Sequence, residues 1–89
     1  MARAAWEAYA RERDIELIFF DPPAHFDHAI VGLVEGFGQE LAVVYDMALV
    51  LEAMTADMGA EDAEEWFGFN TIGAYVGPAT PRFLIRRPE

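Results

Sequence analysis

Between Asp14 and Pro81 the chain contains neither lysine nor arginine, although this stretch holds every acidic residue except Glu7, Glu12 and Glu89. The 6 basic residues are all arginines, and they lie in the two terminal segments. Carboxylates at this density repel one another, and this repulsion lowers the stability of any compact state. We therefore expect a fold whose surface carries charge of one sign. The charge narrows the partner to something positively charged, and the alternative is that the surface has no partner.

The size and composition of the chain favour one small folded domain, 1–89. Its 89 residues lie near the lower end of comfortable independent folding. Hydrophobic residues make up 54% of the chain, too many for a disordered acidic tail. The formal net charge of −10 exceeds the magnitude of about 2–8 that suffices for solubility, so solubility alone explains it poorly. The absence of cysteine rules out disulfides, thiolate catalysis and cysteine-bound zinc.

The sequence carries no signal for a membrane or a secretory route. Its first residues are charged and lack the apolar stretch of a signal peptide, and no apolar run approaches the roughly 18 residues of a membrane span. An acidic surface is also repelled by anionic lipid and by nucleic acid. We therefore expect a cytoplasmic protein that contacts no membrane and binds no nucleic acid directly.

The first half of the chain predicts one helix and three strands. Apolar residues at helical spacing predict a helix over 2–13, and the β-rich segment 15–20 predicts a strand. Segments 29–37 and 41–45 read as two further strands, joined by a turn at 38–40 into a hairpin.

The second half predicts two helices and a last strand. Asp46 suits a helix N-cap, an apolar stripe follows over 47–58, and Gly59 suits the position after the helix. The pattern over 61–69 predicts a second helix. The glycine- and proline-rich segment 70–81 predicts an irregular ordered loop, and segment 83–85 predicts a closing strand. The expected fold class is α+β: a small antiparallel sheet of three to four strands with two to three helices packed mainly on one face.

The helix over 61–69 carries the strongest functional signal. We expect its inward side to hold Ala63, Trp66 and Phe67. Of the aromatic residues near the helix, most are expected in the core and one or two could anchor a partner, because interfaces favour Trp and Tyr. These residues are Trp66, Phe67, Phe69 and Tyr75.

Four of the acidic residues fall within 61–65, the start of this helix. At about 1.5 Å of rise per residue they span roughly 6 Å of helix axis. Duplex DNA presents about one charge per 1.7 Å, or some three to four over that length, so the densities match. The alternative is a solvated helix start whose acids are favoured by the helix dipole. Ordinary solvated faces intersperse lysine at i+4, and its absence here favours a functional surface. The predicted partner-binding residues are Asp57, Glu61, Asp62, Glu64 and Glu65, with Glu52 and Glu40 on the rim.

Other site chemistries have weaker support. His25 and His28 with Asp27 could begin a metal site, yet they follow a Pro-Pro loop and are more typical of ordinary loop histidines. Asp27 with Asp46 could serve as acid and base, but nothing in their spacing singles them out. Neither nucleotide-binding glycine motif is present, and serine, cysteine and lysine are absent. We expect no enzyme activity, no catalytic residues, no cofactor and no metal ion.

Three pieces of the chain resemble a family of small uncharacterised proteins from phages and related mobile elements. They are residues 26–32, residues 44–46, and the run 69–77 (Phe-Asn-Thr-Ile-Gly-Ala-Tyr-Val-Gly) followed by Thr80-Pro81. Members usually carry Ser or Thr before the acidic helix, where this chain has Ala60. The resemblance implies a core over 26–85 to which 1–20 is an addition. It also implies a mobile genetic element, where small acidic proteins such as several anti-CRISPR proteins disarm host defence.

Charge and resemblance together predict an inhibitor that works in the cytoplasm of the host cell. Its acidic face would mimic nucleic acid and block the Lys/Arg-lined site of a basic nucleic-acid-binding protein, such as the DNA-recognition subunit of a CRISPR surveillance complex. The alternative is a non-catalytic phage interaction or assembly module, which could be a homodimer and whose acids serve solubility. Adaptation to high salt also raises acids and removes lysine, but the high apolar fraction argues against it.

Overall fold

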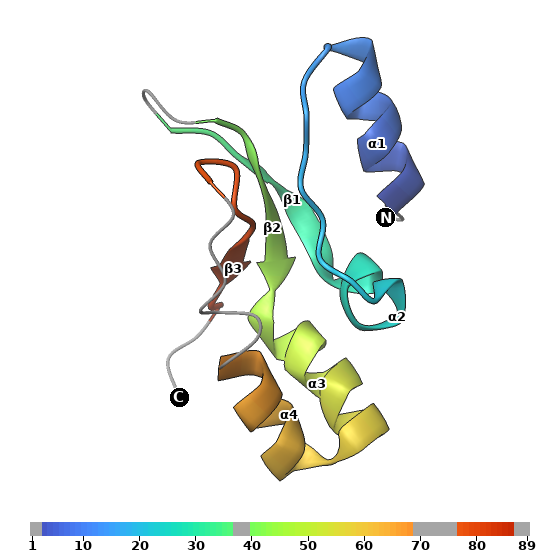
Figure 1. The fold of residues 1–89 in the computed structure, drawn as a ribbon, viewed down its shortest axis with the longest axis vertical. Coiled ribbons are helices and arrows are strands. Elements are labelled where there is room, and N and C mark those ends of the chain that lie inside the picture. Colours follow the sequence, from blue (N-terminus) through green and yellow to red (C-terminus); the bar gives the residue numbers. More distant parts are fainter. Residues whose placement is uncertain (1–2, 37–39, 69–76, 87–89) are drawn as a thin grey trace.

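The protein folds as an α+β domain in which helices and a small sheet share one core (Figure 1). The computed structural model describes residues 3–36, 40–68 and 77–86. It measures 39 × 25 × 23 Å along its principal axes. In chain order the elements are α1 (Arg3–Glu12), α2 (Pro23–Phe26), the 3₁₀ helix η1 (Asp27–Ala29), β1 (Ile30–Val34), β2 (Ala42–Asp46), α3 (Met47–Met58), α4 (Ala60–Trp66) and β3 (Arg82–Leu84).

The described sheet has three strands in the order β1-β2-β3. The predicted hairpin is confirmed, because β1 and β2 pair antiparallel with Ile30 opposite Tyr45 and Val34 opposite Ala42. Its expected turn includes residues 38 and 39, which lie outside the described residues. The prediction of an antiparallel sheet is wrong for β3, which runs parallel to β2. A parallel partner needs a crossover connection, and the helical hairpin α3–α4 provides it.

The predicted strand over 15–20 is wrong. The connection from α1 to α2, which contains this stretch, runs as a long trace in Figure 1, but the stretch joins no ladder in the described sheet. At Phe20 the backbone N–H donates to the Tyr45 hydroxyl at 2.9 Å, and the backbone carbonyl accepts from the Arg3 guanidinium at 2.7 Å. Side chains therefore satisfy the polar backbone groups that a neighbouring strand would otherwise satisfy.

The junction between β2 and α3 follows the sequence expectation closely. Asp46 is the N-cap of α3, and its Oδ1 accepts from the Leu49 backbone N–H at 3.2 Å. After α3, Gly59 takes a φ of 89°, a left-handed value that glycine adopts without steric cost. The chain then turns directly into α4, so α3 and α4 form a helical hairpin.

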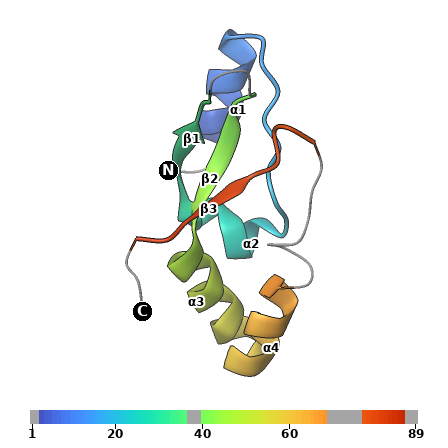
Figure 2. The same cartoon turned by 90° about the vertical axis from the view of Figure 1, so that its left-hand side faces the viewer.

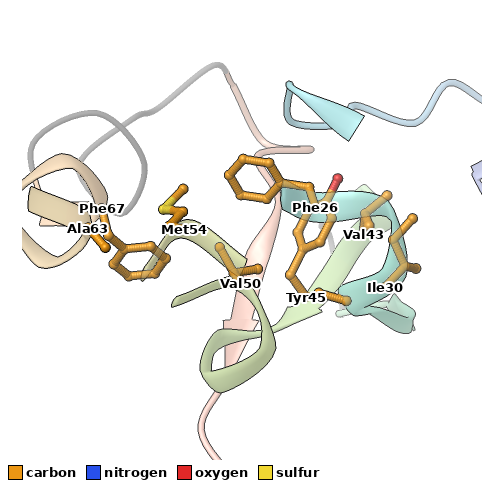
Figure 3. Packing of buried hydrophobic residues seen from close by; sticks show 9 residues of the cluster. Phe26, Ile30, Val43, Tyr45, Val50, Met54, Ala63 and Phe67 are labelled. Atoms are coloured by element: carbon orange, nitrogen blue, oxygen red, sulfur yellow. The ribbon is translucent and has the colours of Figure 1, made fainter. Parts of the chain in front are cut away.

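The core runs from the sheet into this helical hairpin (Figure 3). Tyr45, Phe26, Met54, Val43 and Val50 are its largest fully buried side chains. Around them lies a group of aromatic contacts with centroid distances of 5.8 Å (Phe20 to Tyr45), 5.8 Å (Phe20 to Phe83) and 4.9 Å (Phe67 to Phe83). Because Phe67 follows α4 directly, this packing fixes α4 against the sheet.

The N-terminal segment belongs to the same core. Trp6, Leu17, Phe19 and Phe20 pack against the buried cluster. In Figure 2 the connection from α1 to α2, α2 itself and α4 lie to the right of the strands, whereas α3 continues downward from β2. The helices α2 and α4 thus lie on one side of the sheet, and α1 lies on the β1 side.

Candidate functional site

The four predicted acidic residues at 61–65 all lie on α4, and all four are exposed. A helix turns by about 100° per residue, which places them on an arc of about 160°. The buried residues Ala63 and Phe67 mark the opposite side of the helix. The carboxylates therefore form one continuous face, here called the α4 acidic face: Glu61, Asp62, Glu64 and Glu65.

Among the described residues, no ion pair neutralises this face. The basic side chains whose contacts are known bind elsewhere. Arg3 lies 3.2 Å from Asp21 and 3.1 Å from Asp27. Arg86 pairs with Asp46, at the far end of α3 from its junction with α4. These two arginines are thus engaged away from the α4 acidic face.

Two more predicted residues, Glu52 and Asp57, lie on α3 and are exposed. Asp57 Oδ2 lies 3.0 Å from His25 Nε2. An ionised carboxylate only accepts hydrogen bonds, so His25 donates from Nε2. The Asp57 side chain remains 66% exposed, which leaves it accessible although the contact fixes its position. Glu52 forms no ion pair within the described part of the chain, and it lies on the side of α3 that faces away from Val50 and Met54.

The remaining predicted residue, Glu40, lies apart from the others. It lies two residues before β2, and the start of β2 lies toward the opposite end of the long axis from the α3–α4 hairpin. There Glu40 lines a cleft of about 630 Å³ together with Asp14, Glu16 and Glu35. Ile15, Ile18, Leu41, Pro78 and Ala79 supply the apolar lining. Sequence reasoning missed this second acidic region because four separate segments contribute to it.

The prediction that Trp66 faces inward is wrong, since the residue is 49% exposed. Ala63 and Phe67 are four residues apart and define the buried stripe of α4. Trp66 lies about 80° from the centre of this stripe, at the border of the α4 acidic face. The i, i+4 spacing of Ala63 and Phe67 is a sequence signal that could have placed Trp66 correctly.

The structure does not bring the candidate metal ligands His25, His28 and Asp27 together. His25 contacts Asp57, Asp27 contacts Arg3, and His28 Nε2 lies 3.3 Å from the Leu49 carbonyl oxygen. In the ranges that the structure describes, no three His, Cys, Asp or Glu side chains are grouped so that they could hold a metal ion. None of the described helices combines the length and apolar character needed to cross a membrane.

An apolar groove of about 300 Å³ lies where α3 begins and β3 ends. Leu49, Leu84 and Ile85 line it and are exposed by 38%, 38% and 62%. The ion pair of Asp46 with Arg86 also borders the groove. The hydrogen bond from Arg86, followed by that from the Leu49 backbone, holds the pKa of Asp46 below its usual value.

Comparisons with models of protein families, with curated proteins and with solved structures gave no match to this chain. Residues 69–76, which hold most of the phage-like motif, with Phe69 and Tyr75, lie outside the described residues.

Proposed function

We propose that this protein inhibits a basic nucleic-acid-binding protein by placing the α4 acidic face in the groove that normally holds phosphates. The observation that carries the proposal is the set of four exposed carboxylates on α4, for which the described residues provide no cationic partner. Carboxylates presented in this way pair with the lysines and arginines that otherwise bind the nucleic acid backbone.

The spacing of the charges supports mimicry of a polyanion. The four acids occupy roughly 6 Å of helix axis, a length over which duplex DNA presents some three to four phosphates. Asp57, held by His25 at the end of α3, and Glu52 place two more exposed carboxylates on the neighbouring helix, about 140° apart around its axis. Glu40 is left out of this surface because it lies at the other end of the molecule.

A rigid support is the second requirement, since mimicry fails if the charges move independently. Phe67 is buried and contacts Phe83 of β3, and Ala63 is fully buried. The α4 backbone is thereby fixed to the core. The net charge of −10 would also steer the protein toward a cationic groove, so association is expected to be fast and to weaken with salt.

The resemblance to small proteins of phages and mobile elements suggests where such an inhibitor acts. We place its target in the cytoplasm of a host cell, in a defence system such as a CRISPR surveillance complex, on its DNA-recognition subunit. Catalysis is not part of this proposal, because blocking a groove requires only steric and electrostatic contact.

A pull-down from host lysate with matched charge variants tests the proposal. One variant reverses three charges on α4 (Glu61→Lys, Asp62→Lys, Glu65→Lys), and its control reverses three at the distant cleft (Glu16→Lys, Glu35→Lys, Glu40→Lys). Both change the net charge equally. We expect the unchanged chain and the control to capture a nucleic-acid-binding protein that is released at high salt, and the α4 variant to capture none. A folded α4 variant that still captures the partner would refute the assignment.

A specific observation favours a second function, that of an assembly module. The apolar groove beside α3 and β3 could bury Leu49, Leu84 and Ile85 against a second copy of the chain. Sedimentation at two concentrations would then give a dimer that Ile85→Glu dissociates. A chain that stays monomeric at both concentrations would exclude this reading and leave the first one in place.

A further inference from the structure

Trp66 is the unusual side chain of α4. Among the large hydrophobic residues that are exposed in the described parts of the chain, it is the only aromatic one; the others are Val31, Leu49, Leu84 and Ile85. The aromatic rings around Tyr45 pack together in the core instead. An indole left half in water forgoes a large gain from burial, so its position calls for an explanation.

The neighbours of Trp66 on the helix are chemically distinctive. Asp62 precedes it by four residues, and side chains at i and i+4 lie next to each other, with about 5–6 Å between their Cβ atoms. Asp62 is exposed and has no ion pair among the described residues. A carboxylate and an indole are therefore neighbours at the border of the α4 acidic face.

We propose that Asp62 and Trp66 together bind one arginine side chain of the partner. The guanidinium would lie flat on the indole, and its N–H groups would donate to the Asp62 carboxylate. This inference rests on the proposed function, because it names the partner group that the α4 acidic face selects. Charge decides the occupant: a base could also stack on an indole, but the phosphates attached to it would be repelled by the carboxylates around Trp66.

The site is expected to discriminate arginine from lysine. A guanidinium is planar and weakly hydrated, and it can stack on an aromatic ring while it donates two parallel hydrogen bonds to a carboxylate. An ammonium is a compact, strongly hydrated charge that gains less from both contacts. Plain charge pairing, in contrast, treats the two residues much alike. Selectivity for arginine is thus the property that Trp66 adds to the face.

The test measures the affinities of hexa-arginine and hexa-lysine peptides for the chain at one low salt concentration. The quantity of interest is the ratio of the two dissociation constants. We expect Trp66→Leu to reduce the preference for arginine by about 2- to 5-fold, the range that an exposed cation–π contact supplies. Asp62→Asn should reduce it as well. In the matched control Glu64→Gln, which removes the same charge on the opposite flank of α4, the ratio should stay unchanged.

The possible results distinguish a failure of the arginine site from a failure of the proposed function. If both peptides bind the unchanged chain but Trp66→Leu leaves their ratio as it was, the arginine site is refuted and charge mimicry survives. If neither peptide binds the unchanged chain at low salt, both are refuted. The indole N–H signal of Trp66, identified by its loss in Trp66→Leu, should shift on addition of hexa-arginine. A signal that does not move would also overturn the inference.

Discussion

Asp46 joins the sheet to the helices that carry the acidic face, and its removal gives a prediction with a calculable size. Its Oδ1 caps α3 at Leu49, its Oδ2 accepts from Arg86, and its side chain is only 7% exposed. Losing an N-cap costs about 1 kcal/mol. The Arg86 side chain is 59% exposed, so solvent screening limits the ion pair to about 0.5 kcal/mol. Asp46→Ala should therefore lower the free energy of unfolding by about 1.5 kcal/mol.

A pair of variants separates the two contributions. Asparagine caps a helix as well as aspartate does but cannot form the ion pair, so Asp46→Asn should lose only about 0.5 kcal/mol. In a chain of this size the expected falls in Tm are about 6–12 °C for Asp46→Ala and about 2–4 °C for Asp46→Asn. Thermal and urea unfolding followed by circular dichroism would measure both. Equal losses in the two variants would refute the assignment of the larger share to the cap.

The pH dependence of the same group gives an internal check. The pKa of Asp46 is lowered in the folded state by the hydrogen bonds from Arg86 and Leu49. A lowered folded pKa stabilises the fold above the unfolded value, here 3.8, and this stabilisation is lost as the pH falls through the folded pKa. The difference in stability between the unchanged chain and Asp46→Asn should thus shrink below pH 3.8. A difference that stays constant down to the acid transition would contradict the ion-pair assignment.

Three further substitutions, all followed by urea unfolding, test the anchoring of α1 and the packing of the core. Arg3→Gln removes contacts to Asp27 and to the Phe20 carbonyl and should cost about 1 kcal/mol; no loss would mean that α1 is not anchored through this residue. Tyr45→Phe leaves the Phe20 N–H without its acceptor and should cost about 1–2 kcal/mol. Burial raises the pKa of Tyr45, so the unchanged chain should also lose stability above pH 10 in a way that this variant does not. Met54→Ala removes a fully buried side chain and should cost about 2–4 kcal/mol, and a loss below 1 kcal/mol would contradict its place in the core.

The parts of the fold that sequence reasoning predicted depend on local signals. The hairpin follows from two short β-rich runs with a turn between them, and the structure places its strands at Ile30–Val34 and Ala42–Asp46. Helix α3 follows from Asp46 at its start, the apolar stripe along it and Gly59 behind it. Each of these signals determines the structure of residues close to it in the sequence. These elements can therefore be predicted without knowledge of the rest of the fold.

The parts that could not be predicted depend on distant contacts. Segment 15–20 has the composition of a strand, yet the Tyr45 hydroxyl and Arg3 take the place of a strand partner at Phe20. The direction of β3 depends on where the α3–α4 hairpin returns the chain, which its own three residues do not encode.

The same limit applies to the acidic surfaces. The acids of α4 are close in sequence and were found from it, whereas the cleft around Glu16, Glu35 and Glu40 exists only in the folded chain. The sequence prediction placed Glu40 in the same surface as the acids of α4, whereas the fold places it in the separate cleft.

Competition on the captured partner tests mimicry most directly. The purified partner would be loaded with labelled nucleic acid and titrated with this protein, with its α4 triple variant and with the variant reversed at the distant cleft. The account predicts that the unchanged chain and the cleft variant release the nucleic acid, whereas the α4 variant releases none. When more nucleic acid is added, the concentration of unchanged chain that releases half of it should rise in proportion. A stable complex holding partner, nucleic acid and this protein together would contradict it.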